Sequence, residues 1–149
     1  MNKIITMFNN ECLQVAVIAW FIAQLLKVIT VLIKYKRLDF RRFVGSGGMP
    51  SSHSSFVSSM AISIGELNGY DSTIFAFAVV VALVVMYDAS GVRRAAGKQA
   101  RVLNQMMVAM EENDTLKFDE KLKELIGHTP IEVFAGCILG IVIALIRFA

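Results

Sequence analysis

The stretch STIFAFAVVVALVVMY, residues 72–87, contains no charged side chain. A run of this kind is the core of a membrane-spanning helix, which needs about 20 largely apolar residues to cross the hydrocarbon layer. The whole chain has the same character: 56% of its 149 residues are hydrophobic, 18% are charged, and the mean hydropathy is +0.60. This composition predicts a single integral membrane domain, residues 1–149, and excludes an ordinary soluble one.

Other segments extend this prediction to an all-α, polytopic bundle with about four membrane-embedded helices. LQVAVIAWFIAQLLKVITVLI (13–33) and PIEVFAGCILGIVIALIRFA (130–149) have the length of full spans. SSHSSFVSSMAISIGEL (51–67) is shorter and serine-rich, which predicts a short or half-embedded helix. Residues 91–112 and 115–127 carry apolar side chains at helical spacing, which predicts amphipathic helices at the membrane surface or against the bundle.

Four polar stretches should meet on one side of the membrane if the four helices cross in turn. They are the basic cluster 34–42, GGMPSSH (47–53), YDASGVRR (87–94) and GHTPIE (127–132). Of the 15 Lys and Arg residues, all but Lys3 and Arg147 lie on this side or just inside it. By the positive-inside tendency we expect this face to be cytoplasmic, at a bacterial inner membrane. The net charge of +3 is too small to suggest a nucleic-acid partner.

GGMPSSH has the features of a helix start that can bind an anion. Ser51 can cap the following helix, whose free amide groups and positive dipole end suit an oxyanion. His53 lies in the first turn, where an imidazole can exchange a proton near neutral pH. The alternative is a simply capped helix with a water-exposed histidine, which these residues alone favour.

GHTPIE precedes the last span and offers a second histidine. Thr129 is a good N-cap, and Glu132 lies four residues after His128, where its carboxylate can accept a hydrogen bond from one ring nitrogen. The other nitrogen would then be available as a nucleophile or base. Alternatively, Thr129 and Glu132 form a capping box, and we expect Glu132 not to serve both roles fully at once.

Cationic groups are available nearby. Arg93 and Arg94 suit phosphate, but basic residues also anchor helix ends at the interface. Asp88 can pair with an arginine or with Lys98, and it lacks a second carboxylate at metal-ligand spacing. Lys27 interrupts the first span, so it either faces a polar cavity or extends to the surface.

Together these stretches resemble the phosphatidic acid phosphatase type 2 and vanadium haloperoxidase superfamily. PSSH places Ser51 and His53 at the family's serine and histidine positions, with Ser52 in place of glycine. HTPIEVFAG places His128 at the second histidine position, with Glu132 in place of aspartate. GGMPSSHS, DASGVRRAAGKQA and GHTPIEVFAG are similar to a divergent branch of small membrane proteins, over roughly residues 20–145.

The resemblance implies a phosphatase that needs no metal or other cofactor and acts on a lipid or prenyl phosphomonoester. His128 would be the nucleophile, Glu132 would orient it, and His53 would be the acid and base. Phosphate oxygens would be held by Ser51, Ser52, a lysine (Lys27 or Lys34) and an arginine (Arg93 or Arg94).

Two other functions remain open at this point. The first is a non-catalytic membrane protein that binds lipid phosphates or scaffolds partners. The second is a small transporter, which three or four short spans would support only as an oligomer. Gly136 and Gly140 have the G-x-x-x-G spacing that permits close helix packing, and a homodimer could form through them.

Overall fold

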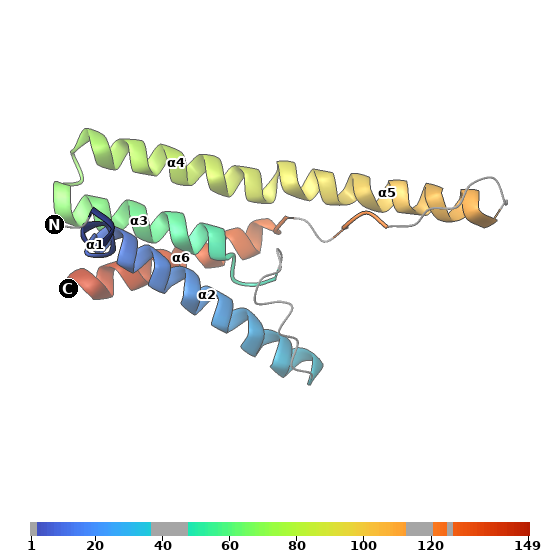
Figure 1. The fold of residues 1–149 in the computed structure, drawn as a ribbon, viewed down its shortest axis with the longest axis horizontal. Helices are drawn as coiled ribbons and strands as arrows, with labels where there is room; N and C mark the ends of the chain where they lie inside the picture. The colour runs from blue at the N-terminus through green and yellow to red at the C-terminus, as the bar shows by residue number, and fades with distance from the viewer. Residues whose placement is uncertain (1–2, 37–47, 113–120, 125–126) are drawn as a thin grey trace.

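The computed structural model describes residues 3–36, 48–112, 121–124 and 127–149, and within these ranges it is all-α (Figure 1). The helices are α1 (Lys3–Phe8), α2 (Glu11–Tyr35), α3 (Ser52–Asn68), α4 (Thr73–Ser90), α5 (Val92–Glu112) and α6 (Pro130–Phe148). Three helical segments are long and apolar enough to cross a membrane: Glu11–Ile33, Thr73–Met110 and Pro130–Phe148. With α3 packed among them, the prediction of an all-α bundle with about four embedded helices is confirmed.

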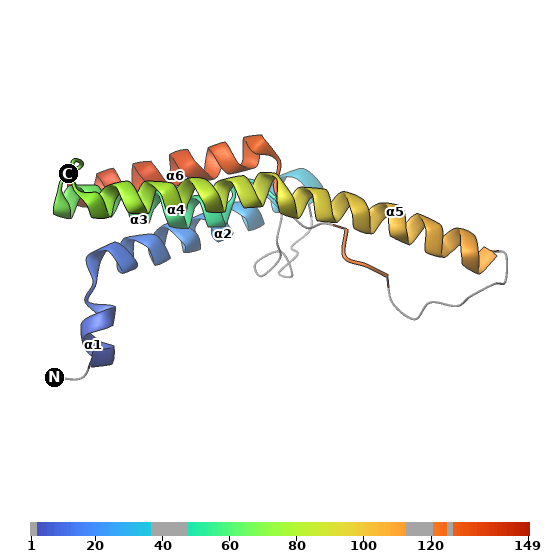
Figure 2. The same cartoon turned by 90° about the horizontal axis from the view of Figure 1, so that it is seen from above.

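The serine-rich helix α3 is the centre of the bundle, and α2, α4 and α6 all pack against it (Figures 1 and 2). Neighbouring helices cover α3, so it does not need the apolar surface of a lipid-facing span. Its serines are small enough for close helix packing, and their hydroxyls bond to backbone carbonyls. Ser55 Oγ donates to Ala19 O at 3.1 Å, and Ser58 Oγ donates to Cys137 O at 3.1 Å.

Two glycines bring α6 against α3. A Cβ atom on Gly136 would collide with the carbonyl of Ser51, and one on Gly140 would collide with Ser55 and Ser58. The close-packing role predicted for the G-x-x-x-G spacing is therefore used inside the chain. Because this face of α6 is covered by α3, a homodimer cannot form through these two glycines in this fold.

Helix α5 follows α4 after Gly91 and extends past the end of the bundle (Figures 1 and 2). Gly97, Ala100 and Asn104 are buried on one side of it, whereas Leu103 and Met106 on another side are exposed. The sequence predicts that this segment is an amphipathic helix at the membrane surface or against the bundle. It is helical, but most of α5 continues beyond the bundle helices (Figure 1), which leaves the membrane surface as the remaining expectation.

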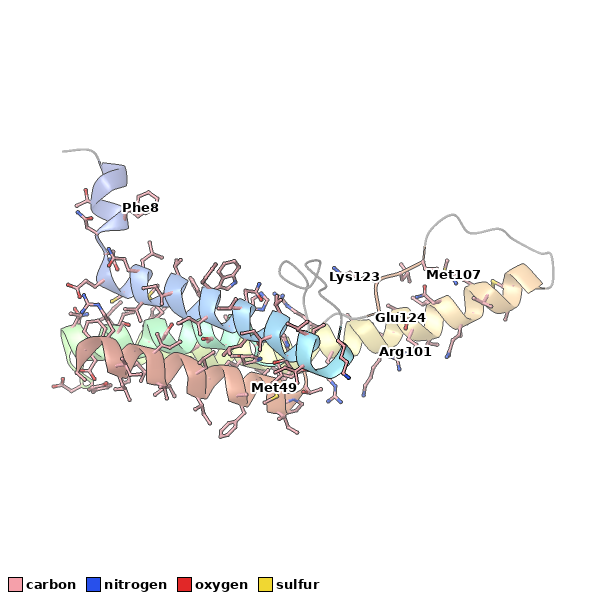
Figure 3. The ribbon with its side chains drawn as sticks, turned by 90° about the horizontal axis from the view of Figure 1, so that it is seen from below. Phe8, Met49, Arg101, Met107, Lys123 and Glu124 are labelled. Atoms are coloured by element: carbon pink, nitrogen blue, oxygen red, sulfur yellow. The ribbon has the colours of Figure 1, made fainter. Side chains whose placement is uncertain are left out.

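Residues 121–124 lie along α5 and are not helical, contrary to the helix predicted for 115–127; the rest of that segment is described only at Gly127. Asn104 explains the difference. Its amide donates to Leu122 O and accepts from Leu122 N, both at 2.8 Å, which satisfies the backbone of Leu122 outside a helix. Arg101 Nε adds a 3.3 Å ion pair with Glu124 Oε2, and Figure 3 shows these two residues beside each other.

The two termini lie at the end of the bundle opposite α5 (Figure 1). Arg147 of α6 forms a 3.1 Å ion pair with Glu11 of α2 at this end. The short helix α1 turns away from α2, as Figure 2 shows. Cys12 and Cys137 are free thiols.

Candidate active site

The start of α3, the end of α4 and the turn before α6 meet where α5 leaves the bundle, and two backbone hydrogen bonds join them. Helix α2 reaches this region at Lys27, about two turns before its own end at Tyr35. Ser51 N donates to Glu132 O at 2.9 Å, which ties the start of α3 to the first turn of α6. His128 N donates to Ala89 O at 2.9 Å, which ties the turn before α6 to the end of α4. The predicted meeting of GGMPSSH, YDASGVRR and GHTPIE is therefore present, whereas most of the basic cluster 34–42 lies outside the described residues.

His128 is held by the first turn of α6. Its Nδ1 atom lies 3.2 Å from Glu132 Oε2, and its side chain is only 2% exposed. The same oxygen accepts a 2.9 Å hydrogen bond from Thr129 N, and Thr129 Oγ1 accepts one from Glu132 N at 3.3 Å. Glu132 thus completes a capping box and contacts the imidazole at the same time. The expectation that these roles exclude each other is wrong, because one carboxylate oxygen accepts both hydrogen bonds.

This contact determines which nitrogen of His128 is available. A carboxylate only accepts, so the 3.2 Å contact is satisfied when Nδ1 carries the hydrogen. The Nε2 atom is buried and has no hydrogen-bond partner among the described residues. Burial lowers the pKa of His128, and the Lys27 charge lowers this pKa further, while Glu132 opposes both effects. The neutral ring therefore presents an Nε2 lone pair that can attack an electrophile or accept a proton.

His53 faces this imidazole from the first turn of α3. The two ring centroids are 6.1 Å apart with an interplanar angle of 63°, and Nδ1 of His53 is also buried without a partner among the described residues. Ser51 caps the helix as predicted, because its Oγ accepts from Ser54 N at 3.3 Å. At this spacing a single tetrahedral anion can contact the edges of both rings.

Lys27 is buried, with 2% of its surface exposed, and it does not extend to the membrane surface. Its Nζ donates to Ser52 Oγ at 3.1 Å. The reason lies in α2, where Ala16, Ala19 and Ala23 are fully buried at helical spacing and Lys27 is the next position on that face. This stripe of small residues is the sequence signal that could have shown that Lys27 points into the bundle.

Arg93 and Arg94 have different surroundings. Arg93 Nε pairs with Asp88 Oδ2 at 2.6 Å, and its charge is close enough to lower the pKa of His128. The side chain of Arg94 is exposed, and only its backbone contacts this region. Gly127 lies so close to that backbone that a Cβ atom on Gly127 would collide with it. Of the two arginines the geometry favours Arg93, with Asp88 as the partner that holds it. The side chain of Lys34 is not among those described.

Within the described ranges, no three His, Cys, Asp or Glu side chains form a group that could hold a metal ion. The groups that converge are two imidazoles, one ammonium, one guanidinium, the hydroxyls at the start of α3, and the carboxylates of Glu132 and Asp88, which pair with His128 and Arg93. Such a set suits an oxyanion, because cationic donors and helix amides surround the free imidazole nitrogens.

The fold and this site define an integral membrane protein with a paired-histidine cluster at one end of its helical bundle. The chain belongs to the Divergent PAP2 family, whose model matches residues 8–143. It is 37% identical over 150 residues to the "Uncharacterized membrane protein YuiD" of Bacillus subtilis (strain 168), covering 94% of this chain and 95% of that protein. No solved structure matches the chain. The resemblance drawn from the motifs is thereby confirmed at the level of the family.

Proposed function

We propose that the protein is a membrane phosphatase that hydrolyses a lipid or prenyl phosphomonoester through a phosphohistidine intermediate. The observation that carries the proposal is the pairing of His128 Nδ1 with Glu132, which leaves a buried, unpartnered Nε2 beside His53. A lone buried histidine would normally have both nitrogens satisfied. Family membership supports the same chemistry.

The reaction has two steps. In the first, His128 Nε2 attacks the phosphorus, the bond to the leaving oxygen breaks, and His53 donates a proton to the departing alcohol. In the second, His53 removes a proton from water, whose oxygen attacks the phosphohistidine and releases inorganic phosphate. Glu132 stabilises the charge on His128 in both steps. Lys27, Arg93, Ser51 and Ser52 hold the phosphoryl oxygens as negative charge develops.

The site faces the cytoplasm of a bacterial inner membrane in this proposal. The support is the distribution of charge, since all but two of the 15 Lys and Arg residues belong to the end that carries the site or to segments just beyond it. A site at the membrane boundary suits a substrate whose tail stays in the bilayer.

A non-catalytic lipid-phosphate binding protein is the second candidate. This candidate is favoured by Ser52, which replaces the glycine of the family motif. The Ser52 hydroxyl already accepts a 3.1 Å hydrogen bond from the ammonium of Lys27. Such a protein would keep the anion pocket and have no turnover.

Phosphate release from a panel of lipid phosphates by the purified protein, with and without Mg²⁺, separates these candidates. We expect release from at least one lipid phosphate, inhibition by vanadate and loss of release in His128→Ala. Ile146→Ala, a change of an exposed side chain on α6, the helix that follows His128, is the matched control. Full activity in His128→Ala would contradict the mechanism. Lipid-phosphate binding without release, in both wild type and His128→Ala, would favour the second candidate.

A further inference from the structure

An apolar groove of about 510 Å³ lies between α2 and α6, beside the candidate active site. It is lined by Leu26, Thr30, Met49, Pro50, Ala135, Ile138, Leu139 and Val142. Met49, Ile138 and Val142 are exposed, so the groove opens at the surface of the bundle, and Figure 3 shows Met49 between α2 and α6. Thr30 adds no free polar group, because its Oγ1 donates to Leu26 O at 2.7 Å. The groove therefore suits an apolar occupant.

The same three chain segments line the groove and contribute residues to the proposed phosphate site. Pro50 directly precedes Ser51, the cap of α3, and Leu26 directly precedes the buried Lys27. On α6, Ala135 lies about one turn after Glu132, and the lining continues from there toward the far end of the helix. One end of the apolar groove therefore adjoins the cationic site, and the other extends along α6 toward the membrane interior.

We propose that this groove binds the hydrocarbon tail of the lipid whose phosphate enters the His53–His128 site. The inference rests on the proposed function and adds the subsite that recognises the tail. A molecule with one long apolar chain that ends in a phosphate fits this arrangement, since the chain would lie in the groove and the phosphate at the adjoining cationic site. A helix from a second copy fits less well, because a helix is about 10 Å wide with a 5.4 Å pitch, so about 510 Å³ holds little more than one turn.

Filling the groove tests the assignment. Ala135→Trp places a large ring in the groove, and Ile138→Trp does so one turn further along α6. Phe134→Trp is the matched control, since Phe134 is 67% exposed on the same helix and does not line the groove. The substrates are butyl, octyl and dodecyl monophosphate, presented to protein in bilayer nanodiscs. All variants share the same bilayer, so partition of the longer chains into lipid is equal for each.

We expect kcat/KM of the wild type and of Phe134→Trp to rise with chain length. In Ala135→Trp and Ile138→Trp the value for dodecyl phosphate should fall at least about tenfold, the equivalent of losing contact with roughly two methylene groups. In Ile138→Trp the value for butyl phosphate should stay within about twofold, because Ile138 lies one turn further from the cationic site than Ala135 and the shorter chain needs less of the groove. A chain-length preference that is unchanged in both groove variants would overturn the proposal.

A binding measurement separates failure of the subsite from failure of the phosphatase. If the wild type releases no phosphate from any alkyl phosphate, the proposed enzyme is wrong, and the rise in Tm caused by each alkyl phosphate is measured instead. Stabilisation that grows with chain length, and that the groove variants lose but Phe134→Trp keeps, supports the groove. Equal stabilisation of all four proteins by dodecyl phosphate means that the chain occupies ordinary bilayer, and the groove assignment fails.

Discussion

The rings of His53 and His128 lie with their centroids 6.1 Å apart, although one belongs to α3 and the other to the turn before α6. The packing of these two helices sets this distance. Gly136 touches the carbonyl of Ser51, the residue that caps the helix bearing His53, and Ser51 N bonds to Glu132 O. The geometry of the pocket thus depends on how closely α6 can approach α3.

Enlarging either glycine should therefore separate the two helices. We expect Gly136→Ala and Gly140→Ala each to destabilise the protein by about 1–3 kcal/mol, the usual cost of overpacking a close contact. Thermal unfolding in detergent measures this effect. Gly136→Ala should also reduce lipid-phosphate hydrolysis, because the new Cβ would press on the residue that caps α3. Ile146→Ala, on the lipid-facing side of α6, should leave Tm nearly unchanged.

The two histidines should fail in different ways when each is replaced. His128→Ala removes the nucleophile and should abolish both phosphate release and the phosphoenzyme. His53→Ala should lower kcat by about 10²–10⁴, the usual contribution of a general acid or base. It should also let the phosphohistidine accumulate when the leaving group needs no protonation, as with 4-nitrophenyl phosphate. Acid-labile label from the ³²P-substrate measures the intermediate, and equal labelling of both variants would contradict the assigned roles.

Lys27 provides a test that separates function from structure. Lys27→Met keeps much of the volume but removes a buried charge, and replacing a buried charge by an apolar group is often neutral or stabilising. We expect phosphate release to fall by about 10² or more, as for loss of one oxyanion donor, while Tm is unchanged or raised. A loss of Tm that parallels the loss of activity would show that Lys27 supports only the fold.

The choice between Arg93 and Arg94 can be decided by comparing them. Arg93→Ala should reduce kcat/KM by about 10²–10³, whereas Arg94→Ala should have a much smaller effect. The loss of kcat/KM in Asp88→Asn should lie between those of the two arginine variants, because the change weakens the 2.6 Å ion pair with Arg93 Nε but leaves the guanidinium present. A larger loss in Arg94→Ala than in Arg93→Ala would reverse the assignment.

Hydropathy was sufficient to predict where the membrane helices lie. The segments 13–33, 51–67, 72–87 and 130–149 differ by only a few residues from α2, α3, α4 and α6. Alternate crossing then required the described polar stretches to meet, and they do. These predictions succeeded because a membrane helix satisfies its own backbone, so its position depends on local composition.

Features that depend on contacts between distant segments could not be predicted from hydropathy. The non-helical backbone at Leu122 is bonded by the amide of Asn104, a contact for which the local sequence carries no signal. The double role of Glu132 needed the orientation of His128 relative to Thr129 N. The burial of Lys27 was accessible in principle, because Ala16, Ala19 and Ala23 mark the face of α2 that packs inside the bundle.

The pH dependence of catalysis should reveal the contact between His128 and Glu132. In the proposed mechanism the nucleophile is the neutral imidazole, so kcat/KM should rise as the pH increases through the pKa of His128. Burial and the Lys27 charge place this pKa below its ordinary value of 6.5, so the midpoint of the acid limb should lie below pH 6.5. The Glu132 carboxylate raises the pKa, because it favours the protonated ring.

Glu132→Gln should therefore move the acid limb to lower pH while it reduces the maximum rate. The amide can still accept a hydrogen bond through its oxygen, so the ring orientation and the cap of α6 are retained. Glu132→Asp is the matched control, because it keeps the charge and restores the residue found in related phosphatases. The profiles should be compared on one substrate, so that titration of its phosphate cancels. An acid limb that moves to higher pH in Glu132→Gln would show that Glu132 does not act on the nucleophile through its charge.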